Sequence, residues 1–389
     1  MIKPRNGGQS NRRQPYNYHI SKMYEDGIFN RKLPIVTTDP SLLEEQARKA
    51  MGQKPFGYIY AGAGVMLSVE ANRRAFDKWR IIPRYLKPSS PRDLTVKLFG
   101  EVYGSPLLIA PMGVQGTFHP SGERGIIAAC AELGIPYSLS TAATTSIEDV
   151  ADACGSHPHW YQLYWPKDDD ITVSLLSRVK ASGYRALIVT LDTTAVGWRP
   201  HDLDLANLPF LEGIGNAVAF SDPVFRSKFS DISNGDTPEK NPTAAARFWI
   251  SQVASGYYHS WEDLALLRKH WDGPILLKGV LSVEDAKLAL KHGMNGIIVS
   301  NHGGRQLDGE LTVMFDSGIR TGSDIIKAIA LGAQAVLVGR PVLYGLGIAG
   351  KDGAIAVLAN LLADLDQSMG ISGFTSITDL QRSILREAK

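Results

Sequence analysis

The stretch IIVSNHGGRQLDGELTVMFDSGIR, from Ile297 to Arg320, decides the fold of this chain. Two apolar runs with strand-like composition, GIIVSN and TVMFDSG, lie on either side of a polar insert. The insert carries a His, an Arg, an Asp and several Gly within a few residues. Polar residues directly after a strand are typical of the catalytic face of an α/β fold. The stretch therefore predicts two strands with a functional site at their ends.

The chain repeats this pattern from about residue 106 onward, as an apolar run, a polar turn and then a helical pattern. Most of the runs are apolar throughout, as parallel strands covered by helices are. Eight such units favour an α/β TIM (β/α)8 barrel over a doubly wound sheet. The runs are PLLIAPM (106–112), YSLST (137–141), HWYQLYW (159–165), ALIVTLD (186–192), PILLKGV (274–280), GIIVSN (296–301), TVMFDSG (312–318) and AVLVGR (335–340).

The length of 389 residues allows one large barrel, and we expect a single domain over residues 1–389. Residues 1–105 would form an N-terminal helical extension, and residues 106–370 would form the barrel. The extension contains two helical patterns, DPSLLEEQARKAM, with Asp39 as its cap, and SVEANRRAFDKW. We expect these helices to cover the bottom or the flank of the barrel.

Residues 200–260 interrupt the alternation with a long insert that is rich in Asp, Asn, Gly and Pro. An insert after the fourth strand of a barrel lies at the catalytic face, so we interpret it as a lid. For its part SNGDTPEKNP (233–242) the alternative is a disordered surface loop.

Composition and charge exclude several classes of protein. A formal net charge of +2 gives no general attraction to nucleic acid or to an anionic membrane. No apolar run reaches the roughly 18–20 residues that span a bilayer. Cys130 and Cys154 form no CxxC pair, which argues against a disulfide framework and favours a reducing, cytoplasmic location. The basic N-terminus lacks an apolar signal core and is interpreted as a frayed tail, with organelle targeting as the alternative.

Three short segments resemble sites that the rest of the sequence does not support. AGAG near residue 61 and GIG near residue 213 lack the GxGxxG spacing of a dinucleotide-binding loop. His157 and His159 have no further ligand at metal spacing, so a turn is the better interpretation. We therefore predict no metal site.

Polar or glycine residues follow all eight predicted strands at their C-terminal ends, where the catalytic groups of a barrel lie. One such residue usually has a structural explanation, such as a helix cap for Asp192 or an ion pair for Lys278. Eight ends together favour a functional site. In strand order the residues are Gly113; Ser140 and Thr141; Gln162 and Tyr164; Thr190, Asp192 and Arg199; Lys278; Ser300, His302 and Arg305; Asp316, Gly318 and Arg320; and Gly339 and Arg340.

The types of these residues indicate the chemistry. Residues after the seventh and eighth strands occupy the usual phosphate position of a barrel, and Arg320 and Arg340 suit a phosphate dianion. His302 is a candidate general base that Asp192 can orient. The remaining groups suit oxidation of a small hydroxy acid beside a phosphate-anchored cofactor that the residues alone do not name. They are Arg199 and Arg305 for a carboxylate, Tyr58 and Tyr164 as hydroxyl donors, and Lys278 for negative charge on the cofactor.

The motifs SNHGGRQLD, DSGIR, LVGRP and YQLYW closely resemble those of the FMN-dependent α-hydroxy-acid oxidizing family, which includes glycolate oxidase, lactate oxidase and lactate 2-monooxygenase. The resemblance runs from FGYIYAGAG to the C-terminus and implies a TIM barrel that holds FMN at its mouth. It also implies the role of each site residue. His302, Asp192 and Tyr164 would be catalytic; Tyr58, Tyr164, Arg199 and Arg305 would contact substrate; Pro111, Met112, Gly113, Ser140, Gln162, Thr190, Lys278 and Ser300 would contact the flavin; and Asp316, Gly318, Arg320, Gly339 and Arg340 would hold the ribityl phosphate.

Within this family, LDTTAVGWRPHDL, LPFLEGIGNAVAFSDPVF and the small Ala142 look most like lactate 2-monooxygenase and its relatives. The resemblance implies oxidation of a small L-2-hydroxy acid, L-lactate first, with O2. In the monooxygenase type the keto acid is held and decarboxylated, so that lactate gives acetate, CO2 and water. The alternative is the oxidase type, which releases pyruvate and hydrogen peroxide. Family members are commonly tetramers or larger, so a homo-oligomer is expected by analogy.

The connection between the sixth and seventh predicted strands is short. About ten residues separate Asn301 from Thr312, whereas a parallel crossover needs about a dozen or more and is usually helical. The family has a helix here, so we expect the sixth barrel helix to be missing. A splice product or faulty gene model, an extended loop and a displaced strand all explain this. The loss would expose apolar surface at ~25 cal/mol per Å2, so an inactive flavin-binding barrel is a further alternative.

Overall fold

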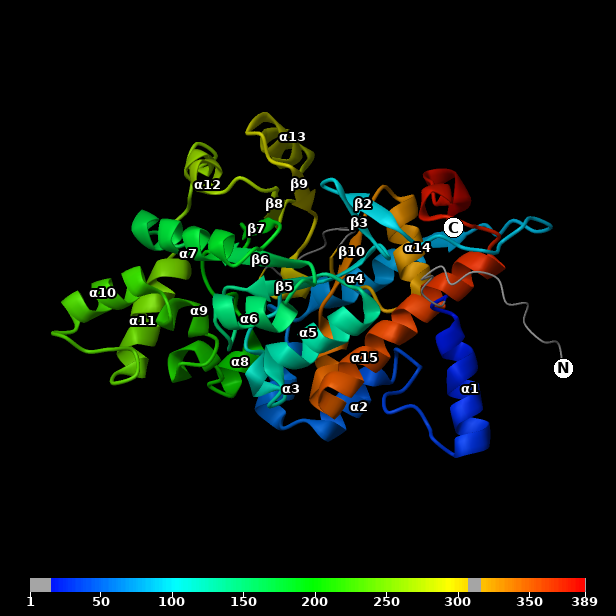
Figure 1. The fold of residues 1–389 in the computed structure, drawn as a ribbon, viewed down its shortest axis with the longest axis horizontal. Helices are drawn as coiled ribbons and strands as arrows, with labels where there is room; N and C mark the ends of the chain where they lie inside the picture. The colour runs from blue at the N-terminus through cyan, green and yellow to red at the C-terminus, as the bar shows by residue number, and fades with distance from the viewer. Residues whose placement is uncertain (1–14, 307–315, 389) are drawn as a thin grey trace.

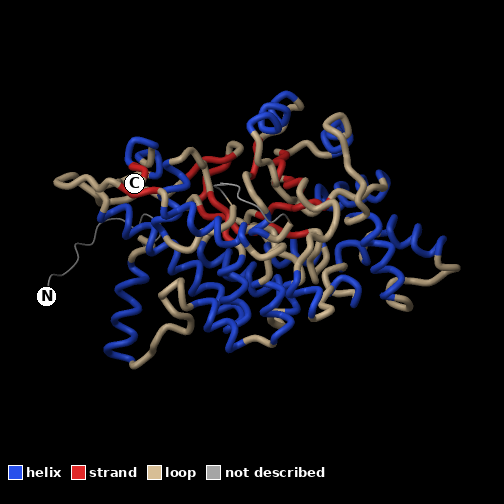
Figure 2. The backbone as a smooth tube through the Cα atoms, turned by 180° about the vertical axis from the view of Figure 1, so that it is seen from behind, coloured by secondary structure: helices blue, strands red, loops and turns tan. Residues whose placement is uncertain are grey.

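The structure, a computed structural model, describes residues 15–306 and 316–388. Its centre is a set of parallel strands with helices around them (Figure 1; Figure 2). Strands β5 to β9 form one parallel sheet in sequence order, β10 pairs in parallel with β4, and a bridge between Met112 and Leu139 joins the two groups. This order is that of a TIM barrel. The strands are β4 (Leu107–Ile109), β5 (Tyr137–Ser140), β6 (His159–Tyr164), β7 (Leu187–Thr190), β8 (Ile275–Lys278), β9 (Gly296–Ile298) and β10 (Val336–Val338).

Helices connect these strands and lie outside them. Most of them begin at side chains that the sequence places for capping, for example Asp168, whose carboxylate accepts a hydrogen bond from Ile171 N at 3.1 Å. Thr321 and Asp324 form a reciprocal capping box at the start of another helix. The connecting helices are α5 (Gly122–Leu133), α6 (Ile147–Cys154), α7 (Asp169–Ala181), α12 (Leu264–His270), α13 (Val283–Lys291), α14 (Gly322–Ala330) and α15 (Arg340–Ile371).

Most of the predicted seventh strand and of the short connection before it falls on residues 307–315, outside the described residues, and so does the expected loss of a helix. The predicted N-terminal tail likewise lies mostly outside them. On the described side, Asp316 N donates to Val299 O at 3.3 Å, so the chain continues beside the end of β9. Nearby, α13 exposes 64% of Val283 and 77% of Leu290, whereas β5, β7 and β8 are buried along their whole length.

The N-terminal extension contacts both ends of the barrel, whereas its two predicted helices were expected to cover the bottom or the flank. The turn of the β2–β3 hairpin packs Phe99 against Trp160 at the start of β6, with ring centroids 6.0 Å apart. At the other end, Ala63 N donates to Gly304 O at 2.8 Å, which places the segment between α3 and α4 at the barrel mouth. The elements are α1 (Tyr18–Asn30), α2 (Leu43–Ala50), α3 (Gln53–Tyr60), α4 (Leu67–Asp77), β1 (Trp79–Ile81), which pairs with β11 (Leu385–Glu387), β2 (Val96–Leu98) and β3 (Glu101–Tyr103).

Asp39 does not cap the first predicted helix of this extension. Helix α2 begins after Leu42, which provides no capping side chain. A turn over residues 40–42 separates Asp39 from the helix, and Asp39 accepts a hydrogen bond from Ser41 N at 2.8 Å instead. That part of the sequence interpretation was therefore wrong by one turn of chain.

The insert after β7 is helical and packs on one side of the barrel, where Figure 1 shows it in green beside α7. Its core stacks Phe225 against Phe248, with ring centroids 5.3 Å apart. Asp222, which is fully buried, ties it to the barrel by an ion pair with Arg178 at 3.1 Å. The segment 233–242, for which a disordered loop was the alternative, forms hydrogen-bonded turns between two helices. The helices are α8 (Pro200–Asp204), the 3-10 helix η2 (Pro209–Glu212), α9 (Ala217–Phe220), α10 (Pro223–Ile232) and α11 (Pro242–Val253).

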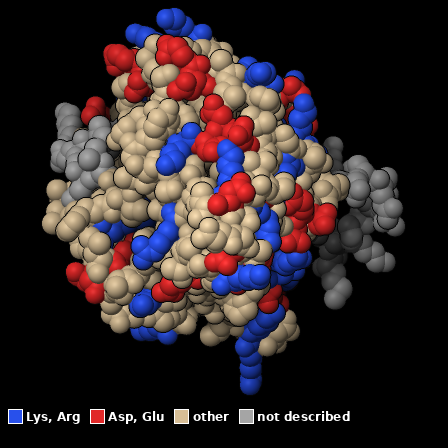
Figure 3. All heavy atoms as spheres, turned by 90° about the vertical axis from the view of Figure 1, so that its left-hand side faces the viewer, with Lys and Arg blue, Asp and Glu red and all other residues tan. Residues whose placement is uncertain are grey.

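Within the described ranges, one helix, α15, is long and apolar enough to cross a membrane by length and composition, although the sequence showed no uninterrupted apolar run. Its apolar part is 61% buried and packs against α5 and α14, as a core helix does. Cys130 and Cys154 are buried and unpaired. Basic and acidic side chains are interspersed on the face that Figure 3 shows, in agreement with the small net charge.

The close contact between α14 and α15 gives a test of the packing. A Cβ at Gly322 would lie 2.2 Å from Leu365 N and 2.4 Å from Asp364 C, backbone atoms that have little freedom to move. We expect Gly322→Ala to lower the free energy of unfolding by about 1–3 kcal/mol in urea titrations. Gly27→Ala, in α1 with nothing within 4 Å, is the control and should leave it unchanged or raise it by about 0.5–1 kcal/mol. Equal effects of the two changes would contradict this account.

Candidate active site

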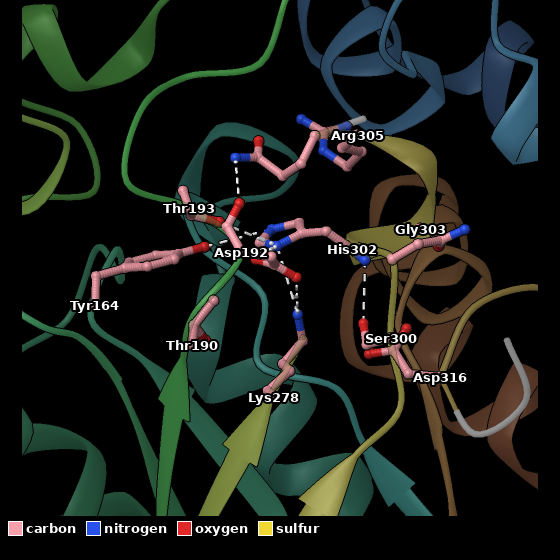
Figure 4. Close-up of polar contacts among 12 residues, drawn as sticks. Tyr164, Thr190, Asp192, Thr193, Lys278, Ser300, His302, Gly303, Arg305 and Asp316 are labelled. Atoms are coloured by element: carbon pink, nitrogen blue, oxygen red, sulfur yellow. Dashed lines mark hydrogen bonds and ion pairs between the residues drawn. The ribbon is translucent and has the colours of Figure 1, made fainter. Parts of the chain in front are cut away.

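His302, just beyond the end of β9, is at the centre of the site (Figure 4). Its Nδ1 lies 2.8 Å from Oδ1 of Asp192, which follows β7. Because Nδ1 faces a carboxylate, it carries the ring proton and leaves Nε2 as the basic nitrogen. Nε2 faces the Tyr164 hydroxyl at 3.4 Å, at the end of β6. Three different strand ends thus bring an imidazole, a carboxylate and a hydroxyl together.

Burial and neighbouring charges determine the protonation of His302, Asp192 and Tyr164. Burial and the neighbouring Lys278 lower the pKa of His302, although Asp192 acts in the opposite direction. Burial also opposes the charge of Asp192, but Lys278 and His302 hold the pKa of that carboxyl well below its usual range. Burial raises the pKa of Tyr164, so its hydroxyl stays protonated. The site therefore holds a neutral imidazole beside a charged carboxylate at neutral pH.

The loop that carries His302 has an unusual backbone conformation. His302 has a φ of 60°, in the left-handed region that non-glycine residues rarely adopt, and Gly303 and Gly304 follow at 67° and 77°. Hydrogen bonds hold the loop there, from His302 N to Ser300 Oγ at 3.1 Å and from Gly303 N to Ser317 Oγ at 3.0 Å. Strain of this kind gathers at functional sites, where surrounding contacts maintain it.

Two arginines lie together on the side of the site nearest α3. Arg305 donates through Nη1 to the carbonyls of Tyr58 and Ala61, and its guanidinium carbon lies 4.6 Å from the Tyr58 ring centroid. Among the described residues its Nη2 is buried without a hydrogen-bond partner. Burial and the nearby Arg199 lower the pKa of Arg305 to about 10. A bound carboxylate would accept a hydrogen bond from Nη2, and its negative charge would stabilise the charged guanidinium.

A row of polar side chains crosses the mouth beneath His302. Ser140 Oγ donates to Gln162 Oε1 at 3.0 Å, and Gln162 Nε2 donates to Thr190 Oγ1 at 2.9 Å. All three are buried, Ser140 and Thr190 at the ends of β5 and β7 and Gln162 two residues before the end of β6. Lys278 continues the row at the end of β8 and lies 3.5 Å from Asp192 Oδ2. Such a row suits the polar edge of a planar heterocycle.

Arg320 and Arg340 lie at the other end of the site. Their side chains donate hydrogen bonds to backbone carbonyls, from Arg320 to Ile319 O at 2.9 Å and from Arg340 to Gly303 O at 3.2 Å. Neither forms an ion pair with a carboxylate in the part of the chain that the structure describes. Burial and Arg340 together lower the pKa of Arg320 to about 10. A bound phosphate would offset this concentration of positive charge.

The structure therefore brings all the sequence-predicted residues together, while the role of each stays a prediction. Asp192 and Ser300 lie behind His302, and Ser140, Gln162 and Thr190 form the buried row. The others border one cavity: Tyr58, Pro111, Met112, Gly113, Tyr164, Arg199, Lys278, His302, Arg305, Asp316, Gly318, Arg320, Gly339 and Arg340.

Several residues of the site were not predicted. Thr193 Oγ1 donates to Asp192 Oδ1 at 2.8 Å, and Gln306 joins Arg199 to the carbonyl of Asp192 through bonds of 2.8 and 2.9 Å. In the sequence, these two residues are marked only by their positions directly after Asp192 and Arg305, which were predicted. The apolar wall of the cavity comes from the insert, through side chains that include Phe210 and Trp249, and had no signal beyond the position of the insert.

The residues present fit FMN. The buried polar row and Lys278 suit the heteroatom edge of the flavin ring, and Arg320 and Arg340 suit its phosphate. The Nη2 of Arg305, which has no hydrogen-bond partner within residues 15–306 and 316–388, remains for a substrate beside them. Of the described residues, no group of three or more His, Cys, Asp and Glu could hold a metal ion.

Comparisons with known proteins agree with this assignment. Residues 47–387 match the family model described as FMN-dependent dehydrogenase. The structure is similar to a crystal structure of mandelate oxidase, with a TM-score of 0.76 and 32% identity over 91% of this chain and 99% of the other.

Relatives of similar length give the same family. FMN-dependent alpha-hydroxy acid dehydrogenases of Penicillium citrinum and Schizosaccharomyces pombe are 48% and 46% identical over 96% of this chain and 96% and 97% of theirs. L-lactate oxidase of Lysinibacillus sphaericus is 37% identical over 87% of this chain and 90% of its own length. Both fungal proteins are more similar to this chain, so the expected likeness to the lactate enzymes stays a prediction. The chain belongs to the family of FMN-dependent α-hydroxy acid dehydrogenases, and its cofactor is FMN.

Proposed function

We propose that this enzyme oxidises a small L-2-hydroxy acid, L-lactate first, with O2 as the final electron acceptor and by the monooxygenase type of reaction. FMN-dependent oxidation of an α-hydroxy acid follows from the family, whereas the size of the substrate and the products are the proposal. One observation carries it: His302 and Arg305 border one cavity, and Arg305 has a buried nitrogen that no described residue partners. A base and a carboxylate partner are what a 2-hydroxy acid requires.

His302 acts as the base of the reaction. Its Nε2 accepts a proton from the hydroxy acid, and the charged Asp192 carboxylate 2.8 Å from Nδ1 stabilises the imidazolium that forms. Bound FMN supplies the two-electron acceptor. The protonated hydroxyl of Tyr164 donates a hydrogen bond to the oxygen of the substrate that becomes the keto group.

Arg305 and Arg199 bind the substrate carboxylate. A buried donor without a partner costs about 1–3 kcal/mol, more when it is charged, and a carboxylate removes that cost at Arg305. Arg199 is itself held by Gln306 and by the Arg305 carbonyl, at 2.8 and 2.9 Å. Its position is therefore fixed before the substrate binds, which reduces the entropy lost on binding.

The insert supports a small substrate and a retained product. Ala142 borders the cavity with only a methyl group, while Phe210, Trp249 and Val253 line the cavity on the side of the insert. A covered site slows product release. The keto acid then stays while O2 is reduced to hydrogen peroxide, and the peroxide decarboxylates it, so that lactate and O2 give acetate, CO2 and water.

Two alternatives have different observable products. An oxidase of the same family would release pyruvate before it meets the peroxide. An inactive flavin-binding barrel, considered because of the short connection after β9, would bind FMN and give no turnover. Purified protein that is yellow but not bleached by L-lactate without O2 would favour the inactive barrel.

The product ratio tests the monooxygenase proposal. We expect air-saturated holoenzyme with L-lactate to form one acetate and one CO2 per O2 consumed. Added catalase should leave the O2 consumption unchanged, because no peroxide is released. Stoichiometric pyruvate and hydrogen peroxide would overturn the monooxygenase type and leave the oxidase.

Removal of the base should stop the chemistry without removing the cofactor. We expect His302→Gln to slow anaerobic flavin reduction by L-lactate about 10²–10⁴-fold, the usual contribution of a general base. The flavin absorbance of the purified variant should match that of the wild type. His270→Gln, in the last turn of α12 outside the barrel, is the matched control. Rapid flavin reduction in the His302 variant would show that another group is the base.

The pH dependence follows from the lowered pKa of His302. The neutral imidazole is the active form, so kcat/KM should be constant above this pKa and fall about tenfold per pH unit below it. Burial and Lys278 place the midpoint of that fall below the ordinary value of 6.5. Asp192→Asn removes a charge that raises this pKa, so it should move the midpoint to still lower pH as well as reduce the rate. A midpoint that moves upward would contradict this.

A further inference from the structure

A third arginine reaches the phosphate end of the cavity from outside the barrel. Arg73 belongs to α4, in the N-terminal extension, and borders the same cavity as Arg320 and Arg340. The helical pattern of α4 gave no reason to assign it a role.

The side chain of Arg73 joins α4 to the loop that carries Arg320. Its Nη1 donates to the carbonyl of Gly318 and, at 2.9 Å, to Asp324 Oδ2. The same Asp324 oxygen accepts hydrogen bonds from Arg320 N and Thr321 N, each at 3.0 Å. One guanidinium thus contacts this loop both directly, at Gly318, and through the carboxylate that caps α14.

The backbones at this junction are too close to be rearranged easily. Gly318 has a φ of 85°, and a Cβ there would lie 2.4 Å from the carbonyl oxygen of Asn72, which precedes Arg73. Asn72 also exchanges side-chain hydrogen bonds of 3.0 and 2.8 Å with Asn301, next to His302. Helix α4 is therefore held against the loops after β9 and before α14. The backbone position from which the Arg73 side chain extends is fixed as a result.

The positive charges at the phosphate end of the cavity favour the binding of an anion. Burial, Arg340 and Arg73 lower the pKa of Arg320 to about 10. The salt bridge to Asp324 balances Arg73 only, because Arg320 and Arg340 form no ion pair among the described residues. A phosphate dianion between these side chains would balance the two remaining charges.

We propose that Arg73 is a positioning residue for the phosphate of FMN, because it holds the loop from Gly318 to Arg320 in its binding conformation. The N-terminal extension is then part of the cofactor site. This inference rests on the cofactor that the family establishes and not on the proposed substrate or products.

The test compares FMN with riboflavin, which lacks the phosphate. Flavin is removed from purified holoenzyme, and each flavin is titrated back by its fluorescence. Arg73→Ala should weaken FMN binding about 10–100-fold, as expected for loss of charge-assisted hydrogen bonds. Its affinity for riboflavin should stay within about twofold of the wild type. Arg73→Lys keeps the charge but not the forked geometry, so its FMN affinity should lie between the two.

Arg74→Ala is the matched control, since Arg74 is 76% exposed on the same helix and pairs with Glu70 at 3.0 Å. It should change neither affinity. Equal losses for FMN and riboflavin in both Arg73 variants would mean that Arg73 only supports the fold, and unchanged FMN affinity would mean that it does not act on the phosphate. Either result overturns the proposal. If Arg73→Ala does not fold, the ratio of FMN to riboflavin affinity in Arg73→Lys decides.

Discussion

The parallel register of β5 to β8 is the constraint on which the site depends. Tyr164 pairs with Thr190 and Thr190 with Lys278, so neighbouring strands end at one edge with their polar residues together. Side chains alternate along a strand, so a shift of one residue would turn such a group away from the mouth. The hydrogen bonds from Ser140 to Gln162 and from Gln162 to Thr190 run across the strands and stabilise this register further.

The same constraint explains what could be predicted from the sequence. Because catalytic groups of a barrel follow its strands, the positions of His302 and Asp192 could be derived once the strands were recognised. The position of Arg73 could not be derived, because its contact with Gly318 joins residues 245 positions apart. The apolar pattern of α4 also does not show which face of the helix meets the loop. The wall formed by Phe210 and Trp249 could not be predicted either, since the packing of an insert on a barrel is a tertiary contact.

Helix α13 leaves large apolar side chains exposed to solvent. Val283 and Leu290 of α13 are 64% and 77% exposed, on the helix that precedes β9. The site is assembled on both sides of residues 307–315, because Asp316 N bonds to Val299 O and Gly303 N to Ser317 Oγ. The loop after β9 therefore contacts the residues that begin at Asp316 directly.

Asp192 links the two chemical halves of the site. Its Oδ1 lies 2.8 Å from His302 Nδ1 and sets the tautomer of the base, while its Oδ2 lies 3.5 Å from Lys278 Nζ beside the polar row. Lys278 lowers the pKa of His302 and Asp192 raises it, so the basicity of the imidazole depends on the balance of two opposite charges. Transfer of a proton to His302 brings a second positive charge to the same carboxylate. The protonation of His302 and the charge of Lys278 beside the polar row are therefore coupled electrostatically through the Asp192 carboxylate.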